Sequence, residues 1–138
     1  MTTGKKRILL VDDDADFVRM NKAVLEHDGY EVIVAYNGAE CMEKAKACKP
    51  DLVILDIMMT TVGDGMFAAQ NLRREEATRE VPIIVVTSVN KTPPYNIGPD
   101  EAWMPVDVFI EKPVAPEVLL EEVRKKLGQP STVIYRRT

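Results

Sequence analysis

Five short runs of aliphatic and β-branched residues constrain the fold of this chain more than any other feature of its sequence. Most of the stretches between them carry the spacing of amphipathic helices. Runs that are apolar throughout are typical of strands buried on both faces of a parallel sheet, because the crossover connections place helices over both faces. The sequence therefore predicts an α/β protein with a five-stranded parallel sheet, whose strands are RILLV (7–11), EVIVA (31–35), DLVIL (51–55), PIIVV (82–86) and VDVFI (106–110).

The predicted helices have recognisable ends. After the first strand, apolar residues follow the spacing i, i+3, i+7 and i+8, which predicts one apolar helix face made of Phe17, Met20, Val24 and Leu25. Residue types that favour helix ends flank this and two later segments. They are Asp14 and Asn37 as N-caps, Pro116 in a first turn, and Gly29 and Gly128 beyond last turns.

Length, hydropathy and charge disfavour a membrane protein and a nucleic-acid-binding protein. The 138 residues fit one domain, and the longest apolar runs are far too short to span a bilayer. The start, MTTGKKRILLVDDD, lacks a small-residue cleavage site after its apolar run, so we predict a cytoplasmic protein without an export signal. A net charge of −4 disfavours nucleic acid as the main partner, because phosphate contacts require clustered lysine and arginine.

Polar side chains stand where the predicted strands end. Asp12 and Asp13 follow the first strand, Asp56 the third, Thr87 the fourth and Lys112 the fifth. In open parallel sheets, binding and catalytic residues lie outside the carboxyl ends of the strands. The acids converge only if the first and third strands are neighbours, which the flavodoxin-like order 2-1-3-4-5 provides. We therefore predict a doubly wound sheet with that order.

Three converging carboxylates would require a cation. Carboxylates about 5 Å apart repel by roughly 3 kcal/mol per pair at an effective dielectric near 20, and one lysine does not offset three of them. A set of oxygen ligands with room for water is what Mg²⁺ prefers. We therefore expect Asp12, Asp13 and Asp56 to form a Mg²⁺ site, whereas Asp14 is expected only to cap the first helix.

Four motifs at these strand positions resemble the receiver domains of two-component response regulators. They are LLVDDD, DLVILDIMM, PIIVVTS and FIEKPV, and the resemblance covers residues 5–127, leaving 128–138 as a short tail. In that family, the aspartate that ends the third strand accepts a phosphoryl group from the phosphohistidine of a sensor histidine kinase. The resemblance therefore implies that Asp56 is the modified residue and that Mg²⁺ is the cofactor.

The resemblance also implies roles for the neighbouring residues. Asp13 would bind the ion directly, Asp12 mainly through water, and Met58 through its main-chain carbonyl. Lys112 resembles the family's phosphate-binding lysine, and the Lys112–Pro113 bond its cis peptide. Thr87 corresponds to the switch hydroxyl and Phe109 to the aromatic residue that swings between outward and inward positions.

Two segments depart from the family pattern. The loop after Asp56 has Thr60 where proline is usual, and it places its glycines at Gly63 and Gly65. The segment between the fourth and fifth strands is about three residues longer than usual, and 93–105 contains four prolines. Because proline breaks helix interiors, we expect the helix between these strands to be irregular or shortened, and residues 90–105 to be a largely non-helical partner surface.

Two other functions require residues that this chain lacks, and a third stays open. A Mg²⁺-dependent aspartyl-phosphate phosphohydrolase needs a second carboxylate two residues after the nucleophile, where this chain has Met58. A flavin mononucleotide site needs a hydroxyl- and glycine-rich loop after the first strand, and DDDADF would repel its phosphate. A receiver fold kept only as a phosphorylation-independent interaction module stays open.

We therefore expect a stand-alone response regulator, as either a monomer or a weak dimer. The protein would be a phosphoacceptor that assists its own phosphorylation and dephosphorylation, and not an enzyme acting on others. Its partners would be a histidine kinase and a downstream protein or phosphotransfer protein.

Overall fold

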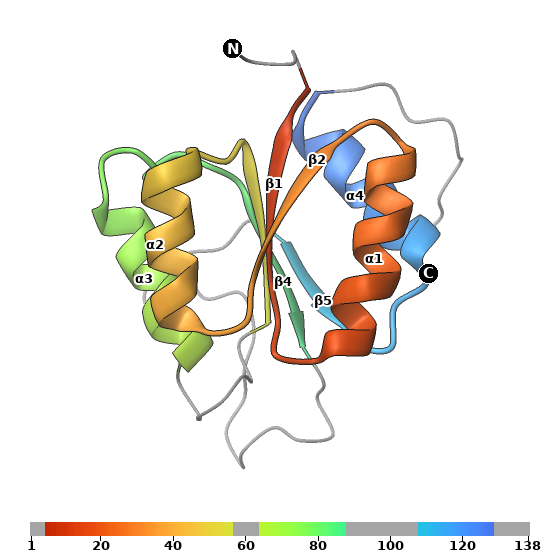
Figure 1. The fold of residues 1–138 in the computed structure, drawn as a ribbon, viewed down its shortest axis with the longest axis horizontal. Coiled ribbons are helices and arrows are strands. Elements are labelled where there is room, and N and C mark those ends of the chain that lie inside the picture. The colour runs from red at the N-terminus through yellow and green to blue at the C-terminus, as the bar shows by residue number, and fades with distance from the viewer. Residues whose placement is uncertain (1–4, 57–63, 88–107, 129–138) are drawn as a thin grey trace.

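The computed structural model describes residues 5–56, 64–87 and 108–128, which form one α/β sheet structure (Figure 1). Four helices and five strands alternate along most of the described chain, as the hydrophobic periodicity predicts. The strands are β1 (Arg7–Val11), β2 (Glu31–Ala35), β3 (Leu52–Leu55), β4 (Ile83–Thr87) and β5 (Val108–Glu111). The helices are α1 (Ala15–His27), α2 (Gly38–Cys48), α3 (Asp64–Arg74) and α4 (Pro116–Lys126).

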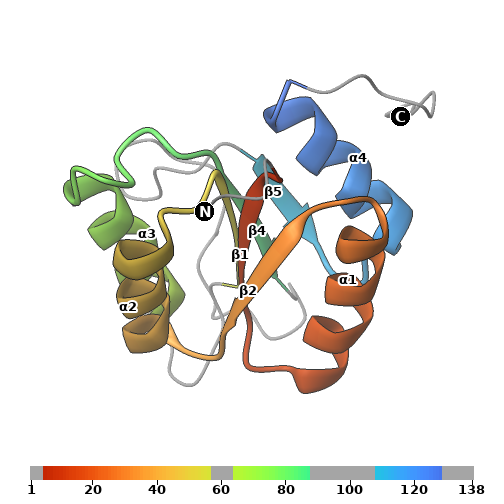
Figure 2. The same ribbon diagram turned by 45° about the horizontal axis from the view of Figure 1, so that its top comes forward.

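The sheet has the predicted order, β2-β1-β3-β4-β5, and all neighbouring strands run parallel. Figures 1 and 2 show α1 and α4 over one face of the sheet and α2 and α3 over the other. The flavodoxin-like, doubly wound fold is therefore confirmed. The carboxyl ends of β1 and β3 lie side by side, because Val11 and Leu55 are register partners.

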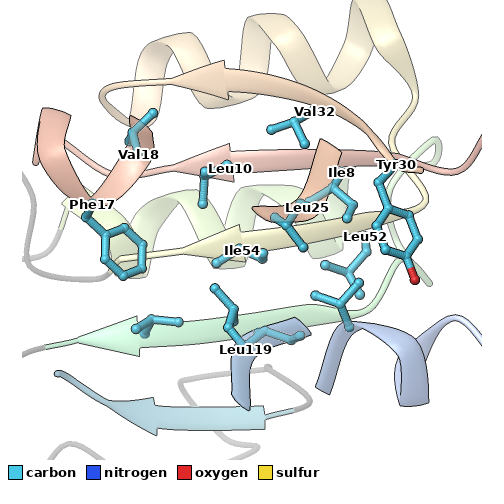
Figure 3. Close-up of a cluster of buried hydrophobic side chains, with 13 residues drawn as sticks. Ile8, Leu10, Phe17, Val18, Leu25, Tyr30, Val32, Leu52, Ile54 and Leu119 are labelled. Atoms are coloured by element: carbon cyan, nitrogen blue, oxygen red, sulfur yellow. The ribbon is translucent and has the colours of Figure 1, made fainter. Parts of the chain in front are cut away.

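Both faces of the sheet are covered by buried apolar side chains. Successive residues of each strand point to opposite faces. On the α2 and α3 face, Leu9 and Val11 of β1 pack with Leu72 of α3. On the α1 and α4 face, Ile8 and Leu10 pack with side chains from both helices, including Phe17, Leu25 and Leu119 (Figure 3). Burial on both faces explains why the strands read as continuous apolar runs.

The apolar face predicted for α1 is partly wrong. Met20 is 49% exposed, whereas Val18 and Asn21 are buried together with Phe17 and Leu25. The face toward the sheet therefore follows the spacing i, i+1, i+4 and i+8. A polar residue can occupy it because Asn21 Nδ2 donates a 2.9 Å hydrogen bond to the Phe17 carbonyl oxygen.

The predicted helix ends are present. The Asp14 side chain accepts hydrogen bonds from the backbone N–H groups of Asp16 and Phe17, and Asn37 accepts one from Glu40. Gly29 follows α1 with φ +98°, a conformation that side chains disfavour. The C-cap of α2 is Lys49, whose left-handed φ of 49° the sequence did not indicate.

Two further expectations concern the segment between the fourth and fifth strands and the absence of a membrane-spanning helix. The helix expected to be irregular or shortened falls within 88–107, outside the described residues, so it stays a prediction together with the surface at 90–105. None of the helices in the described ranges combines the length and hydropathy needed to cross a membrane.

Candidate functional site

Two buried aspartates lie next to each other at the carboxyl edge of the sheet. Asp12 follows β1 and is 1% exposed, and Asp56 follows β3 and is 5% exposed. The sheet ladder continues into both, because Asp12 N–H donates to the Ala35 carbonyl oxygen at 3.1 Å and Asp56 N–H to that of Val11 at 2.9 Å. These hydrogen bonds fix the backbone from which each carboxylate projects.

A third carboxylate completes the cluster from the exposed side. Asp13 is exposed, and one carboxylate oxygen from each of Asp12, Asp13 and Asp56 lies within 4.8 Å of the others. In an octahedral Mg²⁺ shell, oxygens on opposite sides of the ion are about 4.2 Å apart. Three carboxylates at this spacing therefore fit one such ion, bound directly or through its waters.

Lys112 reaches the two buried carboxylates from the end of β5. Its Nζ lies 2.8 Å from Asp12 Oδ2 and 3.4 Å from Asp56 Oδ2. The following peptide bond, Lys112–Pro113, is cis, as the resemblance implied. The sequence separations of 100 and 56 residues show that the fold alone brings these charges together.

Burial sets the protonation chemistry of this cluster. It raises the pKa of the Asp12 carboxyl, although the hydrogen bond from Lys112 acts in the opposite direction. Burial also disfavours a charged lysine, but its hydrogen bond to Asp12 and the charges of Asp12 and Asp56 outweigh this, so the pKa of Lys112 is raised. The ammonium therefore remains charged at neutral pH.

Three predicted site residues are described in part or not at all. Thr87 is the last residue of β4 and is the register partner of Glu111, so its backbone lies beside the residue preceding Lys112. Phe109 lies within β5. The side chains of Thr87 and Phe109, and the whole of Met58, fall outside the described part of the structure.

Phe17 was not predicted to belong to this site. Its spacing marks it only as a core residue, yet its ring centroid lies 4.3 Å from Lys112 Nζ. Two residues 95 positions apart carry no joint signal in a single sequence. The first turn of α1 is close in sequence to Asp12 and Asp13, and this proximity was the available hint.

Comparison with known proteins agrees with the fold and identifies the family. The sequence profile of the response regulator receiver domain matches residues 8–124. The chain belongs to this family. Because the matched span includes Asp12, Asp13, Asp56 and Lys112, the cluster lies entirely within the receiver domain.

Individual relatives have the same fold over most of this chain. The CheY-like receiver domain protein of Methanospirillum hungatei JF-1 is 29% identical with a TM-score of 0.77, covering 91% of this chain and 95% of that chain. For the chemotaxis response regulator CheY4 of Vibrio cholerae the identity is 28% and the TM-score 0.78, covering 89% of this chain and 99% of that one.

The curated relatives are longer proteins. The DNA-binding response regulator MtrA of Mycobacterium tuberculosis (strain ATCC 25618 / H37Rv) is 33% identical over 127 residues, which are 92% of this chain and 53% of that protein. The chain thus spans about half the length of the curated relatives it matches. DNA binding is named for those relatives, and the expectation that nucleic acid is not a partner of this chain stays a prediction.

Proposed function

We propose that this receiver domain accepts a phosphoryl group on Asp56 from the phosphohistidine of a sensor histidine kinase, in a reaction that depends on Mg²⁺. The observation that carries the proposal is the buried carboxylate of Asp56 at the end of β3, with two further carboxylates and the Lys112 ammonium around it. Phosphoryl transfer needs little covalent chemistry from a protein beyond positioning and charge stabilisation, and this cluster can supply both.

Asp56 is the nucleophile in this proposal. Its backbone is held by the hydrogen bond to Val11, so one carboxylate oxygen can stay aligned with the incoming phosphorus. The new O–P bond forms as the donor P–N bond breaks, and the electron pair of that bond stays on the imidazole nitrogen. Lys112, 3.4 Å from Asp56 Oδ2, is placed to bind a transferred phosphoryl oxygen.

The carboxylates of Asp12, Asp13 and Asp56 would hold the Mg²⁺ together with the Met58 carbonyl, in an oxygen-only set that suits this ion. When bound, the ion neutralises carboxylate and phosphoryl charge. Asp12 is buried and paired with Lys112, so it orients the ammonium as well as contributing to the metal site.

The later steps of the proposal rest on the resemblance. Thr87 at the end of β4 donates its hydroxyl to the phosphoryl group, and Phe109 changes position in response. A protein partner then recognises the altered surface, and the protein acts in the cytoplasm as a phosphoacceptor and not as an enzyme on another substrate. The boundaries 5–127 for the domain and 128–138 for the tail belong to this proposal.

Intact-mass measurement with a small acyl phosphate as donor tests the proposal. The protein with Mg²⁺ should gain one phosphoryl group, and Asp56→Asn should gain none, since an amide is not a nucleophile toward phosphorus. A matched control is Asp16→Asn, because Asp16 is an exposed carboxylate near the start of α1 and should be dispensable.

Two results would contradict the proposal. Labelling of Asp56→Asn at the wild-type level would remove Asp56 from the nucleophile's role. Labelling of the wild type that is unchanged by chelation of divalent ions would remove Mg²⁺ from the reaction.

A further inference from the structure

The Lys112 ammonium has a third neighbour besides its two carboxylates. The face of the Phe17 ring lies 4.3 Å from Nζ, measured to the ring centroid, which is within the range of a cation–π interaction. Phe17 is only 9% exposed. Figure 3 shows it where the strands of the α1 and α4 face reach their arrowheads, while Tyr30 of the same cluster lies at their other end.

The ring is fixed relative to Asp12 by the same turn that caps α1. Asp14 N–H donates to Asp12 Oδ1 at 2.9 Å, and the Phe17 N–H donates to Asp14 Oδ1 at 3.3 Å. The Phe17 carbonyl oxygen accepts from Asn21 one turn later. The same turn therefore positions both the backbone that carries the ring and the carboxylate that contacts the ammonium.

The two kinds of partner differ in what phosphoryl transfer does to them. Asp12 and Asp56 belong to the proposed metal site, and Asp56 is consumed as the nucleophile. The ring is neutral, binds no metal and forms no bond to phosphorus. Its attraction for the ammonium is therefore unchanged while the carboxylate contacts of Lys112 are exchanged for phosphoryl oxygens.

We propose that Phe17 is a positioning residue for phosphoryl transfer, and that its ring face holds the Lys112 ammonium beside Asp56 through this exchange. The inference rests on the proposed function and adds a residue to it. An aliphatic side chain of similar volume would fill the same space in the core, but it would leave the ammonium with only its carboxylate contacts to hold it.

The test replaces Phe17 in the full chain by phenylalanines with increasing numbers of ring fluorines, which weaken the attraction for a cation while nearly preserving shape. The first readout is the NMR shift of the Lys112 ε protons in metal-free protein, which the ring current moves upfield. The second is the rate of labelling by a small acyl phosphate at saturating Mg²⁺. Both should decline stepwise with fluorination, the rate by roughly threefold to thirtyfold at the end of the series.

Phe67 supplies a matched control. It lies on α3, is 65% exposed and belongs to neither core cluster, so the same series there should change neither readout. Phe17→Tyr should restore a ring face and most of the rate, whereas Phe17→Leu should not.

The outcomes separate this inference from the proposed function. If the fluorinated proteins keep the wild-type proton shifts and rate, Phe17 is only a core residue and the inference is wrong. If the wild type is not labelled at all, the proposed function fails and the role of Phe17 in transfer fails with it. If the wild type is labelled but the rate does not follow the series, the inference alone is overturned.

Discussion

The two ends of the sheet each join a carboxylate to a cation, and the two arrangements differ in their charge balance. At the carboxyl ends of the strands, the described residues gather three carboxylates, two of which contact the Lys112 ammonium. At the other end, Asp28, which caps α1, meets Arg124 in the last turn of α4. Arg124 Nε lies 3.1 Å from Asp28 Oδ2, and its Nη2 bonds Asp28 Oδ1.

The pair at the amino-terminal end is balanced and joins two helices. The guanidinium fork bonds both oxygens of one carboxylate, which is the geometry that suits arginine. The hydrogen bond that Arg124 donates to Asp28 raises the pKa of Arg124. Burial, together with the charge of Asp28, raises the pKa of Tyr30. A one-to-one pair of this kind requires no further ion.

The cluster at the carboxyl end has more carboxylates than cations, and two of its carboxylates, Asp12 and Asp56, are buried. Burial penalises charged Asp12, and a single ammonium does not offset three acids. We infer that the balanced pair stabilises the contact between α1 and α4. The unbalanced cluster lowers stability in the absence of metal and is suited to bind a cation. Four predictions test this comparison.

The largest expected effect is that of Mg²⁺ on stability. At a hundred times its dissociation constant, an ion that binds only the folded state raises the free energy of unfolding by about 2.7 kcal/mol. We expect this gain in the wild type and its loss in Asp13→Asn. The measurement is urea unfolding with and without Mg²⁺.

Asp28→Asn is the control, because it alters the balanced pair at the other end of the sheet. This variant should be less stable but should keep the full gain from Mg²⁺. If it loses the gain while Asp13→Asn retains it, the metal site has been assigned to the wrong end of the molecule.

The same substitution should have opposite effects at the two ends in metal-free protein. Asp12→Asn keeps an oxygen that can accept from Asp14 N–H and removes a buried charge, so it should raise the free energy of unfolding by about 1 kcal/mol. Asp28→Asn leaves Arg124 with a poorer partner and should lower it. Effects of the same sign at both sites, measured by chemical denaturation in a chelating buffer, would contradict the comparison.

The third prediction concerns pH. Because the folded-state pKa of Asp12 is raised, this group favours folding below its ordinary pKa of about 3.9, and that contribution is lost as pH rises through the folded value. The stability advantage of Asp12→Asn over the wild type should therefore be largest at neutral pH and shrink toward zero near pH 4. Denaturation series of both proteins without metal would measure it, and an advantage that grows on acidification would show that the shift has the other sign.

The smallest effect is expected at Glu121 in α4. This residue is 2% exposed, and its Oε2 has no hydrogen-bond partner within the ranges that the structure describes. Glu121→Gln removes a buried charge at constant size, so unfolding free energy should stay within about 0.5 kcal/mol of the wild type or rise. A clear loss of stability would mean that this carboxylate takes part in an ion pair.

Much of the fold and part of the site could be predicted from local sequence. Continuous apolar runs mark strands buried on both faces, and Asp14 and Asn37 lie where unpaired N–H groups need acceptors. The convergence of Asp12, Asp13, Asp56 and Lys112 followed from strand order, because parallel strands present their carboxyl ends on one edge.

The contacts that sequence reasoning missed depend on side-chain direction and on helix packing. Met20 fits the helical period but points outward, because the rotation of α1 on the sheet is set by tertiary packing. The contact of Phe17 with Lys112 and the pair of Asp28 with Arg124 join residues nearly a hundred positions apart. Such distances carry no periodic signal in one sequence.

Reductive trapping of the phosphorylated protein tests the central claim most directly. Borohydride converts an aspartyl phosphate to homoserine, which marks the modified residue permanently for peptide mapping. We predict homoserine at position 56 after incubation with Mg²⁺ and a small acyl phosphate, with Asp12, Asp13 and Asp28 unchanged. Homoserine at any of those three positions in place of 56, or none in a protein shown to carry phosphate, would contradict the assignment of Asp56 as the phosphoacceptor.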